Sequence, residues 1–290
     1  MDEVDYFAVL RSMVSLKGKH VLEIGGSVPP ALIAPCGVAS WTSIDINQRR
    51  FIESLNNIEI PKWYCTEIMS ACEMTFDREK FDVVYSTNCF EHISDLPLSL
   101  EQIYRVLRPK GILFTIFGPI WSGSVGHHTW VWDNGKPLTF SDNVFPDWFH
   151  LTHNEEELKL YLKERYRPEI VEAILKYVYR SDDINRLVDS VYEREIASFD
   201  YSHIINLKIR SLRGPNRETL RMLKDVYRSV SDFRTLGYFW VYVKGRCELR
   251  FRLRAYLWGG LAILRRKTLE IVRNCFASVS HWMKRLRSNK

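Results

Sequence analysis

The sequence predicts an α/β fold with a doubly wound, mostly parallel sheet. Four apolar segments, residues 20–26, 40–46, 81–88 and 111–119, are separated by stretches long enough for crossover helices. Strands that alternate with helices form parallel sheets, and right-handed crossovers bring the carboxyl ends of the strands to one edge. A further apolar segment, residues 236–245, is expected to close the sheet. We therefore expect a ligand site at that edge.

The composition indicates a folded protein. Of the 290 residues, 46% are hydrophobic and 13% are aromatic, which excludes a disordered chain. The six cysteines show no CxxC pair and no Cys/His spacing typical of zinc, so we expect reduced thiols and no metal. The first residues, "MDEVDYFAVL", lack the basic start and long apolar run of a signal peptide, and no stretch reaches the ~20 apolar residues of a membrane-spanning helix. We expect a cytoplasmic protein.

The remaining elements follow in order along the chain. A short helix is expected at residues 4–16, and the first strand then ends in Gly25-Gly26-Ser27, where glycine allows close approach of the backbone to a ligand. "LRPKG" is expected to end a helix and to turn into the fourth strand. Residues 121–151 show neither a helical nor an alternating period, and a loop this long is usually functional. Asn154 and Glu157 have the spacing of a capping box, so helices resume there and continue to about residue 230.

The first strand and turn favour a nucleoside ligand. A glycine turn followed about twenty residues later by a strand ending in Asp45 provides an acidic acceptor for ribose hydroxyls. A dinucleotide needs backbone N–H groups for its pyrophosphate, and the two prolines of "GGSVPP" remove such donors. S-adenosylmethionine carries no phosphate. The sequence therefore favours S-adenosylmethionine over a nicotinamide cofactor.

Four segments within residues 18–120 resemble successive motifs of a known family. "VLEIGG", "SIDIN", "FDVVYSTNCFEHISDL" and "IYRVLRPKGILFTIFGP" are similar to the motifs of class I S-adenosylmethionine-dependent methyltransferases, in the branch of ubiquinone and sugar methylases. The resemblance implies a seven-stranded Rossmann-like sheet with S-adenosylmethionine as cofactor. The cofactor-binding residues that it implies are Glu23, Gly25, Gly26 and Ser27 at the methionine end, Asp45 and Ile46 at the ribose, Glu67 and Ile68 near the adenine amine, and Asn88, Cys89 and His92 after the third predicted strand. Ser27 and Glu67 depart from the usual pattern, which has glycine and aspartate more often.

The segment "GPIWSGSVGHHTW" is expected to face the methyl acceptor. Methyl transfer is an in-line displacement that depends on positioning, and a hydroxyl acceptor gains from a base such as histidine. His127 and His128 follow the strand at residues 111–119, so one of them is the candidate catalytic base; the alternative is that they order the loop. The aromatic residues of this region are either a platform for a sugar or packing for the loop.

The last 45 residues form a basic tail. Residues 246–290 hold 12 Lys and Arg against 2 Glu, a net charge of +10, so residues 1–245 carry −4 of the total +6. Apolar residues from Leu257 to Leu286 recur at helical spacing, which is typical of an amphipathic helix on an anionic membrane surface. A partner-binding helix is the alternative. Since the basic charge is confined to the tail and "TNCF" lacks the prolines of nucleic-acid amino methylases, no nucleic-acid substrate is expected.

These observations divide the chain into three parts. Residues 1–120 are the expected cofactor-binding core, residues 121–245 the acceptor-side insertion with the closing strand, and residues 246–290 the amphipathic tail. The leading hypothesis is O-methylation of a sugar hydroxyl, on a glycan or lipid-linked glycan at the cytoplasmic membrane face. Two alternatives are methylation of another small molecule, such as a quinone or polyketide, and a catalytically inactive membrane-associated scaffold. The oligomeric state is left open.

Overall fold

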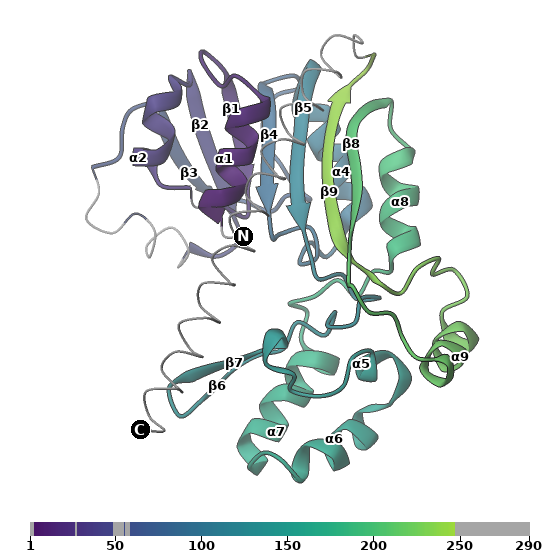
Figure 1. Cartoon of the computed structure of the whole chain (residues 1–290). Coiled ribbons are helices and arrows are strands. Elements are labelled where there is room, and N and C mark those ends of the chain that lie inside the picture. The colour runs from purple at the N-terminus through teal and green to yellow at the C-terminus, as the bar shows by residue number, and fades with distance from the viewer. Residues whose placement is uncertain (1–2, 27, 49–54, 56–58, 247–290) are drawn as a thin grey trace, which may run out of the picture.

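A computed structural model describes residues 3–26, 28–48, 55 and 59–246, with a seven-stranded sheet at its centre. The strand order is β3-β2-β1-β4-β5-β9-β8 (Figure 1). Strands β1 to β5 pair in parallel, whereas β9 runs antiparallel to both β5 and β8. The strands are β1 (His20–Ile24), β2 (Ser40–Asp45), β3 (Tyr64–Ile68), β4 (Phe81–Thr87), β5 (Leu107–Phe117), β8 (Tyr201–Arg210) and β9 (Thr235–Lys244). The predicted doubly wound, mostly parallel sheet is confirmed.

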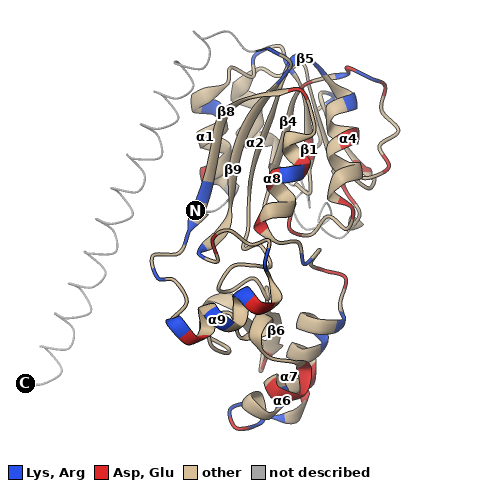
Figure 2. Cartoon of the chain, turned by 90° about the vertical axis from the view of Figure 1, so that its right-hand side faces the viewer, with Lys and Arg blue, Asp and Glu red and all other residues tan. Residues whose placement is uncertain are grey.

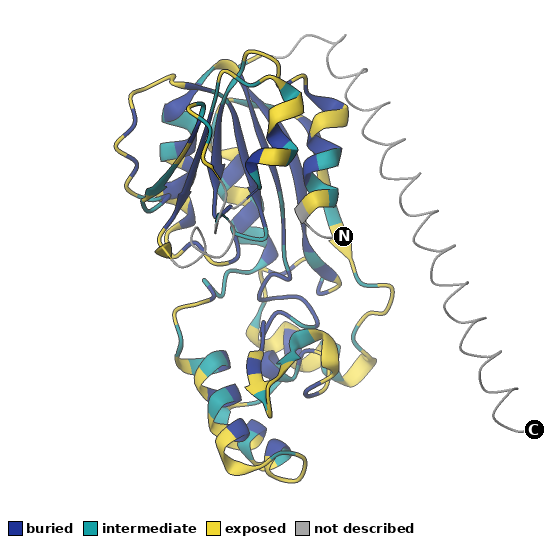
Figure 3. Ribbon diagram, turned by 90° about the vertical axis from the view of Figure 1, so that its left-hand side faces the viewer, coloured by how far each residue is buried: buried dark blue, intermediate teal, exposed yellow. Residues whose placement is uncertain are grey.

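Burial explains which strands are central. Strands β1 and β4 are buried on nearly every residue, as expected for parallel strands covered on both faces, and they read as continuous apolar runs (Figure 3). The chain moves outward from β1 to β3 on one side; on the other side it moves from β4 to β5, then to the edge strand β8, and β9 returns between β5 and β8. The strand order therefore reverses between β1 and β4, and this reversal marks the place where ligands of open α/β sheets bind.

Helices cover both faces of the sheet. On one face, α1 (Glu3–Met13) and α2 (Pro30–Ile33) pack Leu10 and Ile33 against Val21 and Trp41. On the other face, α4 (Leu96–Val106) and α8 (Asp189–Ala197) bury Leu100 and Tyr192 beside Leu22. The sheet thus separates two apolar cores.

The insertion between β5 and β9 has a third apolar core of its own. Its elements are the hairpin of β6 (Trp130–Asp133) and β7 (Lys136–Thr139), the helices α5 (Phe149–Thr152), α6 (Glu155–Lys163), α7 (Pro168–Leu175) and α9 (Arg217–Val226), and a π-helical turn (Lys176–Arg180). Trp148, Leu158 and Ile174 lie in this core. The predicted capping box is confirmed, since Asn154 and Glu157 exchange hydrogen bonds at the start of α6. Acidic residues lie on α6 and α7, and both basic and acidic residues lie on α9 (Figure 2).

Several sequence expectations differ from the structure. The predicted loop at residues 121–151 contains the β6–β7 hairpin, whose signal was Asn134-Gly135, two residues with positive φ that form a tight turn. "LRPKG" lies within β5 rather than before it. Lys110 has a φ of 64°, and the register between β4 and β5 shifts near it, but the strand does not end there. Strands β3 and β8 were not predicted. Residues 247–290, the predicted amphipathic tail apart from Arg246, lie outside the described residues, and within the described part no helix is long and apolar enough to cross a membrane.

Candidate functional site

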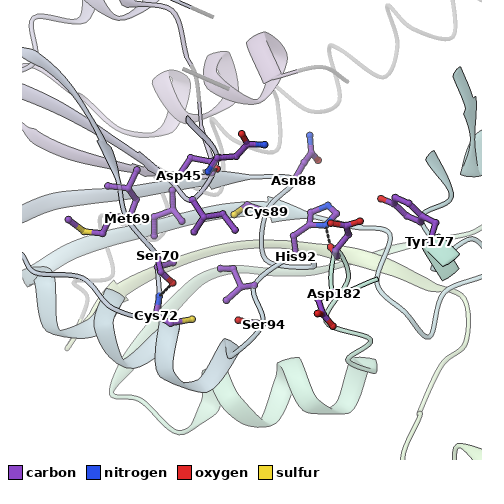
Figure 4. A pocket seen from close by; sticks show the side chains of 18 residues that line it. Asp45, Met69, Ser70, Cys72, Asn88, Cys89, His92, Ser94, Tyr177 and Asp182 are labelled. Atoms are coloured by element: carbon purple, nitrogen blue, oxygen red, sulfur yellow. Dashed lines mark hydrogen bonds between the residues drawn. The ribbon is translucent and has the colours of Figure 1, made fainter. Parts of the chain in front are cut away.

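A cavity of about 530 Å³ lies at the carboxyl ends of β1, β2 and β4, at the reversal of strand order. Gly25, Asp45 and Asn88 line it at the end of each of these strands in turn. Figure 4 shows Asp45 and Asn88 at the cavity. The edge predicted from the βαβ pattern is therefore where the cavity lies.

The turn after β1 is shaped by a buried carboxylate. Glu23 accepts hydrogen bonds from the Trp41 indole (2.7 Å), from the Ser43 hydroxyl and from the backbone N–H of Val28 (3.0 Å). A Cβ at Gly26 would lie 2.1 Å from the Glu23 carboxyl, so only glycine fits there. Gly25 has a φ of 71° and lines the cavity, whereas Glu23 and Gly26 lie behind it. Ser27, predicted at the methionine end, lies outside the described residues.

The end of β2 supplies the acidic side chain predicted to bind a ribose. Asp45 is largely buried and lines the cavity, and its Oδ1 accepts the backbone N–H of Asn47 at 2.7 Å. Ile46 and Asn47 also line the cavity, although Ile46 is 76% exposed. This bond orients the carboxylate at the cavity wall, and ribose binding by Asp45 stays a prediction.

The wall beyond β2 begins one residue later than predicted. Glu67 and Ile68 belong to β3, and neither lines the cavity; Ile68 is 58% exposed. Met69, Ser70 and Cys72 line it instead, directly after the strand. The sequence reasoning missed these three residues, because β3 was not recognised as a strand and its end was not located.

The turn after β4 meets the insertion across the cavity. Asn88 adopts a φ of 47° and donates its backbone N–H to the carbonyl of Ile116, while Cys89 and the exposed His92 line the wall. From the insertion come Tyr177, Asp182 and Asp183, which the sequence reasoning missed. Burial and then the Asp183 charge raise the pKa of Tyr177 to about 12, so its hydroxyl stays protonated and can donate a hydrogen bond.

His127 and His128 differ in their surroundings, and neither is among the residues that line the cavity. His127 is fully buried against Phe145, its Nδ1 lies 2.7 Å from the Thr129 hydroxyl, and burial followed by the His150 and His128 charges holds its pKa well below the ordinary value. His128 is buried too, but its ring lies 5.0 Å from that of His92. His128 is thus the member of the predicted pair that borders the cavity wall.

Comparison with known proteins identifies the part of the chain that carries this cavity. Residues 23–115 match a family model described as a methyltransferase domain. These residues contain the end of β1, the whole of β2, β3 and β4, and most of β5, and so include the ends of β1, β2 and β4 that surround the cavity.

Residues 23–115 are a methyltransferase domain. A structure from Listeria monocytogenes assigned to the S-adenosylmethionine-dependent methyltransferases matches with a TM-score of 0.51 and 13% identity, over 84% of this chain and 99% of that chain, which shows the common fold. The cofactor of the domain is S-adenosylmethionine, as the prolines after Gly26 indicated.

The curated relatives of the methyltransferase domain are named for different activities. An arginine hydroxylase NDUFAF5 from Danio rerio is 26% identical over 121 residues, covering 39% of this chain and 38% of the relative. A probable phthiotriol/phenolphthiotriol dimycocerosates methyltransferase 2 from Mycobacterium ulcerans is 30% identical, covering 34% and 40%. A ubiquinone biosynthesis O-methyltransferase from Coxiella burnetii is 26% identical, covering 36% and 46%. This chain spans less than half the length of each of these relatives.

Replacing Asp45 tests the cofactor site. Asp45→Ala removes the carboxylate from the cavity mouth, so S-adenosylmethionine affinity measured by isothermal titration is expected to fall ~10- to 150-fold, the effect of losing about 1.5–3 kcal/mol of charged hydrogen bonding. Glu67→Ala, which lies off the cavity wall, is the matched control and should bind normally. Unchanged affinity in folded Asp45→Ala protein would assign Asp45 to the Asn47 turn alone.

The buried histidines of the insertion predict a stability that falls in acid. Burial lowers the pKa of His150 from 6.5 to about 4, so below pH 6.5 the unfolded chain binds a proton that the folded chain does not. Between pH 7.5 and pH 5 this single group should remove about 2 kcal/mol of the free energy of unfolding. Urea unfolding should therefore show a shallower pH dependence in His150→Gln, which does not titrate but still donates to the Trp121 carbonyl. An equal pH dependence of unfolding in the unaltered protein and in His150→Gln would contradict this prediction.

Proposed function

We propose that the protein transfers a methyl group from S-adenosylmethionine to a hydroxyl of a sugar, on a glycan or lipid-linked glycan. The observation that carries this proposal is that one cavity is lined from two sides. The methyltransferase domain contributes Gly25 and Asp45 for the cofactor, and the insertion contributes Tyr177, Asp182 and Asp183. Two carboxylates accept hydrogen bonds and a phenol donates one, which suits an acceptor rich in hydroxyl groups.

The chemistry needs alignment more than covalent machinery. The acceptor oxygen must lie in line with the methyl carbon and the departing sulfur, and such positioning can supply about 7–11 kcal/mol of the barrier. A wall made by a separate insertion holds the acceptor independently of the cofactor. Of the two predicted histidines, His128 lies beside His92 at this wall, so it is the candidate to accept the proton of the acceptor hydroxyl.

The aromatic residues of the insertion fall into two groups. Trp121 and Trp148 are buried in the insertion core, so they pack the segment. Trp130 and Trp132 are 51% and 63% exposed, and they alternate with the buried Val131, so both rings stand on one face of the β6–β7 hairpin. Exposed rings of this kind support stacking of a large sugar acceptor.

The second candidate is methylation of another small molecule, such as a quinone or a polyketide. It is favoured by the relative named for ubiquinone biosynthesis, which matches the methyltransferase domain. The carboxylates of Asp182 and Asp183 favour the sugar, because these exposed groups at the cavity wall can accept hydrogen bonds from sugar hydroxyls, which an apolar ring does not offer.

Methyl transfer can be followed with isotopically labelled S-adenosylmethionine. Labelled methyl ethers are expected on glycan or nucleotide-sugar acceptors, and Asp182→Asn should raise the acceptor KM by ~10-fold or more while leaving S-adenosylmethionine affinity unchanged. Lys163→Ala, at the end of α6 and outside the cavity wall, is the control for a surface change in the insertion. Labelling of hydroquinones alone would select the second candidate, and binding of NAD without S-adenosylmethionine would overturn the function.

The proposed site of action is the cytoplasmic face of an anionic membrane, reached through residues 246–290. The net charge of +10 and the apolar periodicity of this sequence support it. Full-length protein should co-sediment with phosphatidylglycerol vesicles, less so at high salt because screening shortens the reach of charges. A chain ending at residue 245 retains β9, the strand between β5 and β8, and should stay in the supernatant. Equal partitioning of the two proteins would contradict the membrane proposal.

A further inference from the structure

Glu91, His92 and His128 place three potential metal ligands beside the cavity. Glu91 and His92 lie in the turn between β4 and α4, whereas His128 lies in the segment between β5 and β6. One ligand atom from each residue lies within 4.8 Å of the other two. Since His92 also lines the cavity, the cluster borders the cavity.

Hydrogen bonds to backbone carbonyls occupy one ring nitrogen of each histidine. The Nδ1 of His92 bonds to the carbonyl of Asp183, and the Nδ1 of His128 lies 3.3 Å from the carbonyl of Gly126. A carbonyl only accepts, so each Nδ1 carries the hydrogen and each Nε2 is left with a lone pair. This pairing of one ring nitrogen with a backbone carbonyl is the usual second contact of a metal-ligating histidine.

Glu91 supplies an unsatisfied carboxylate to the same cluster. Its side chain is 1% exposed; Oε1 accepts the backbone N–H of Gly118 at 3.0 Å, and Oε2 has no hydrogen-bond partner. The Nε2 of His128 lies 3.9 Å from Oε1, too far for a hydrogen bond, and in the described part of the chain no Lys or Arg forms an ion pair with Glu91. A cation bound beside it would stabilise a buried carboxylate in this setting.

The two imidazoles and the carboxylate therefore each offer a lone pair to the same place. One proton can be shared by only two of these three groups, so it would leave the third without a partner. We propose that Glu91, His92 and His128 bind one divalent transition-metal ion, with Zn²⁺ as the ion that best fits two imidazoles and a carboxylate. Ligand atoms around a tetrahedral Zn²⁺ are ~3.3 Å apart, given bonds of ~2.0–2.2 Å, so the side chains close inward by about 1 Å on loading. Three protein ligands leave a fourth position open for a small molecule.

The open position gives the metal a role that rests on the proposed function. The acceptor hydroxyl oxygen binds the ion, and its proton passes to water because the bound oxygen is more acidic. That oxygen then forms a bond to the methyl carbon as the carbon–sulfur bond breaks, and the electron pair stays on sulfur to give a neutral thioether. His128 is then a ligand, and the metal takes the place of a histidine base.

Metal titration of the full chain tests the site directly. Protein stripped with a chelator should bind one Zn²⁺ per chain by isothermal titration, and Co²⁺ should give the visible absorption of a nitrogen- and oxygen-ligated ion. Glu91→Gln and His128→Ala are each expected to weaken Zn²⁺ binding by ~100-fold or more, beyond the 10- to 100-fold typical of outer contacts. His92→Ala repeats the test at an exposed side chain that the fold does not need, and His203→Ala, an exposed histidine on β8, is the matched control.

Each outcome decides the proposal. Loss of the single Zn²⁺ in folded Glu91→Gln and His92→Ala, with normal binding in His203→Ala, supports the site. Absence of Zn²⁺ binding by the unaltered chain overturns it, and so does binding that survives in all three cluster variants, which would place the ion at surface thiols such as Cys65. S-adenosylmethionine titration is run in parallel: its failure would remove the proposed function while leaving the metal result standing.

Discussion

The buried carboxylate of Glu23 is the constraint on which the cofactor side of the cavity depends. It ties β1 to the Trp41 indole and the Ser43 hydroxyl of β2, and to the backbone at Val28 beyond the glycine turn. A buried charge is tolerated only when its hydrogen bonds are satisfied, so these three donors must stay in place. Gly26 follows from the same contact, because its missing side chain leaves room for the carboxyl group. The turn that carries Gly25 is therefore set by packing behind the cavity.

The acceptor side is joined to the core by a comparable set of contacts. The Asn185 side chain donates to the carbonyls of Phe90 and Ile93, and its backbone N–H donates to the carbonyl of Glu91. Tyr192 on α8 donates its hydroxyl to Asn185 in turn. The insertion has its own apolar core, yet these bonds fix it to the turn after β4. The two walls of the cavity are thus parts of one framework, although they come from distant segments of sequence.

The sequence could predict the strands that are marked by a pattern of neighbouring residues. Mainly apolar runs located β1, β4, β5 and β9, because strands buried on both faces need apolar residues at nearly every position. Strand β2 has only Trp41 and Ile44 as apolar residues, and its place followed from the βαβ spacing. Strand β8 lies at the edge with polar residues on its outer side, and β3 has one fully buried residue in five, so neither shows such a run. Gly25, Asp45 and Asn88 followed from motif and strand order. Met69, Ser70 and Cys72 did not, because the end of β3 was not located. Tyr177, Asp182 and Asp183 depend on how the insertion folds back.

The histidines show why spacing alone does not assign roles. His127 and His128 are adjacent, but His128 has a φ of 51°, which turns the chain so that the two rings face different neighbours. His127 packs against Phe145 in the insertion, and His128 stands beside His92 and Glu91. No short motif joins Glu91 to His128, because β5 and its parallel crossover lie between them in the chain. The groups that meet at this wall are brought together by the sheet, and their chemistry becomes readable only once the sheet is formed.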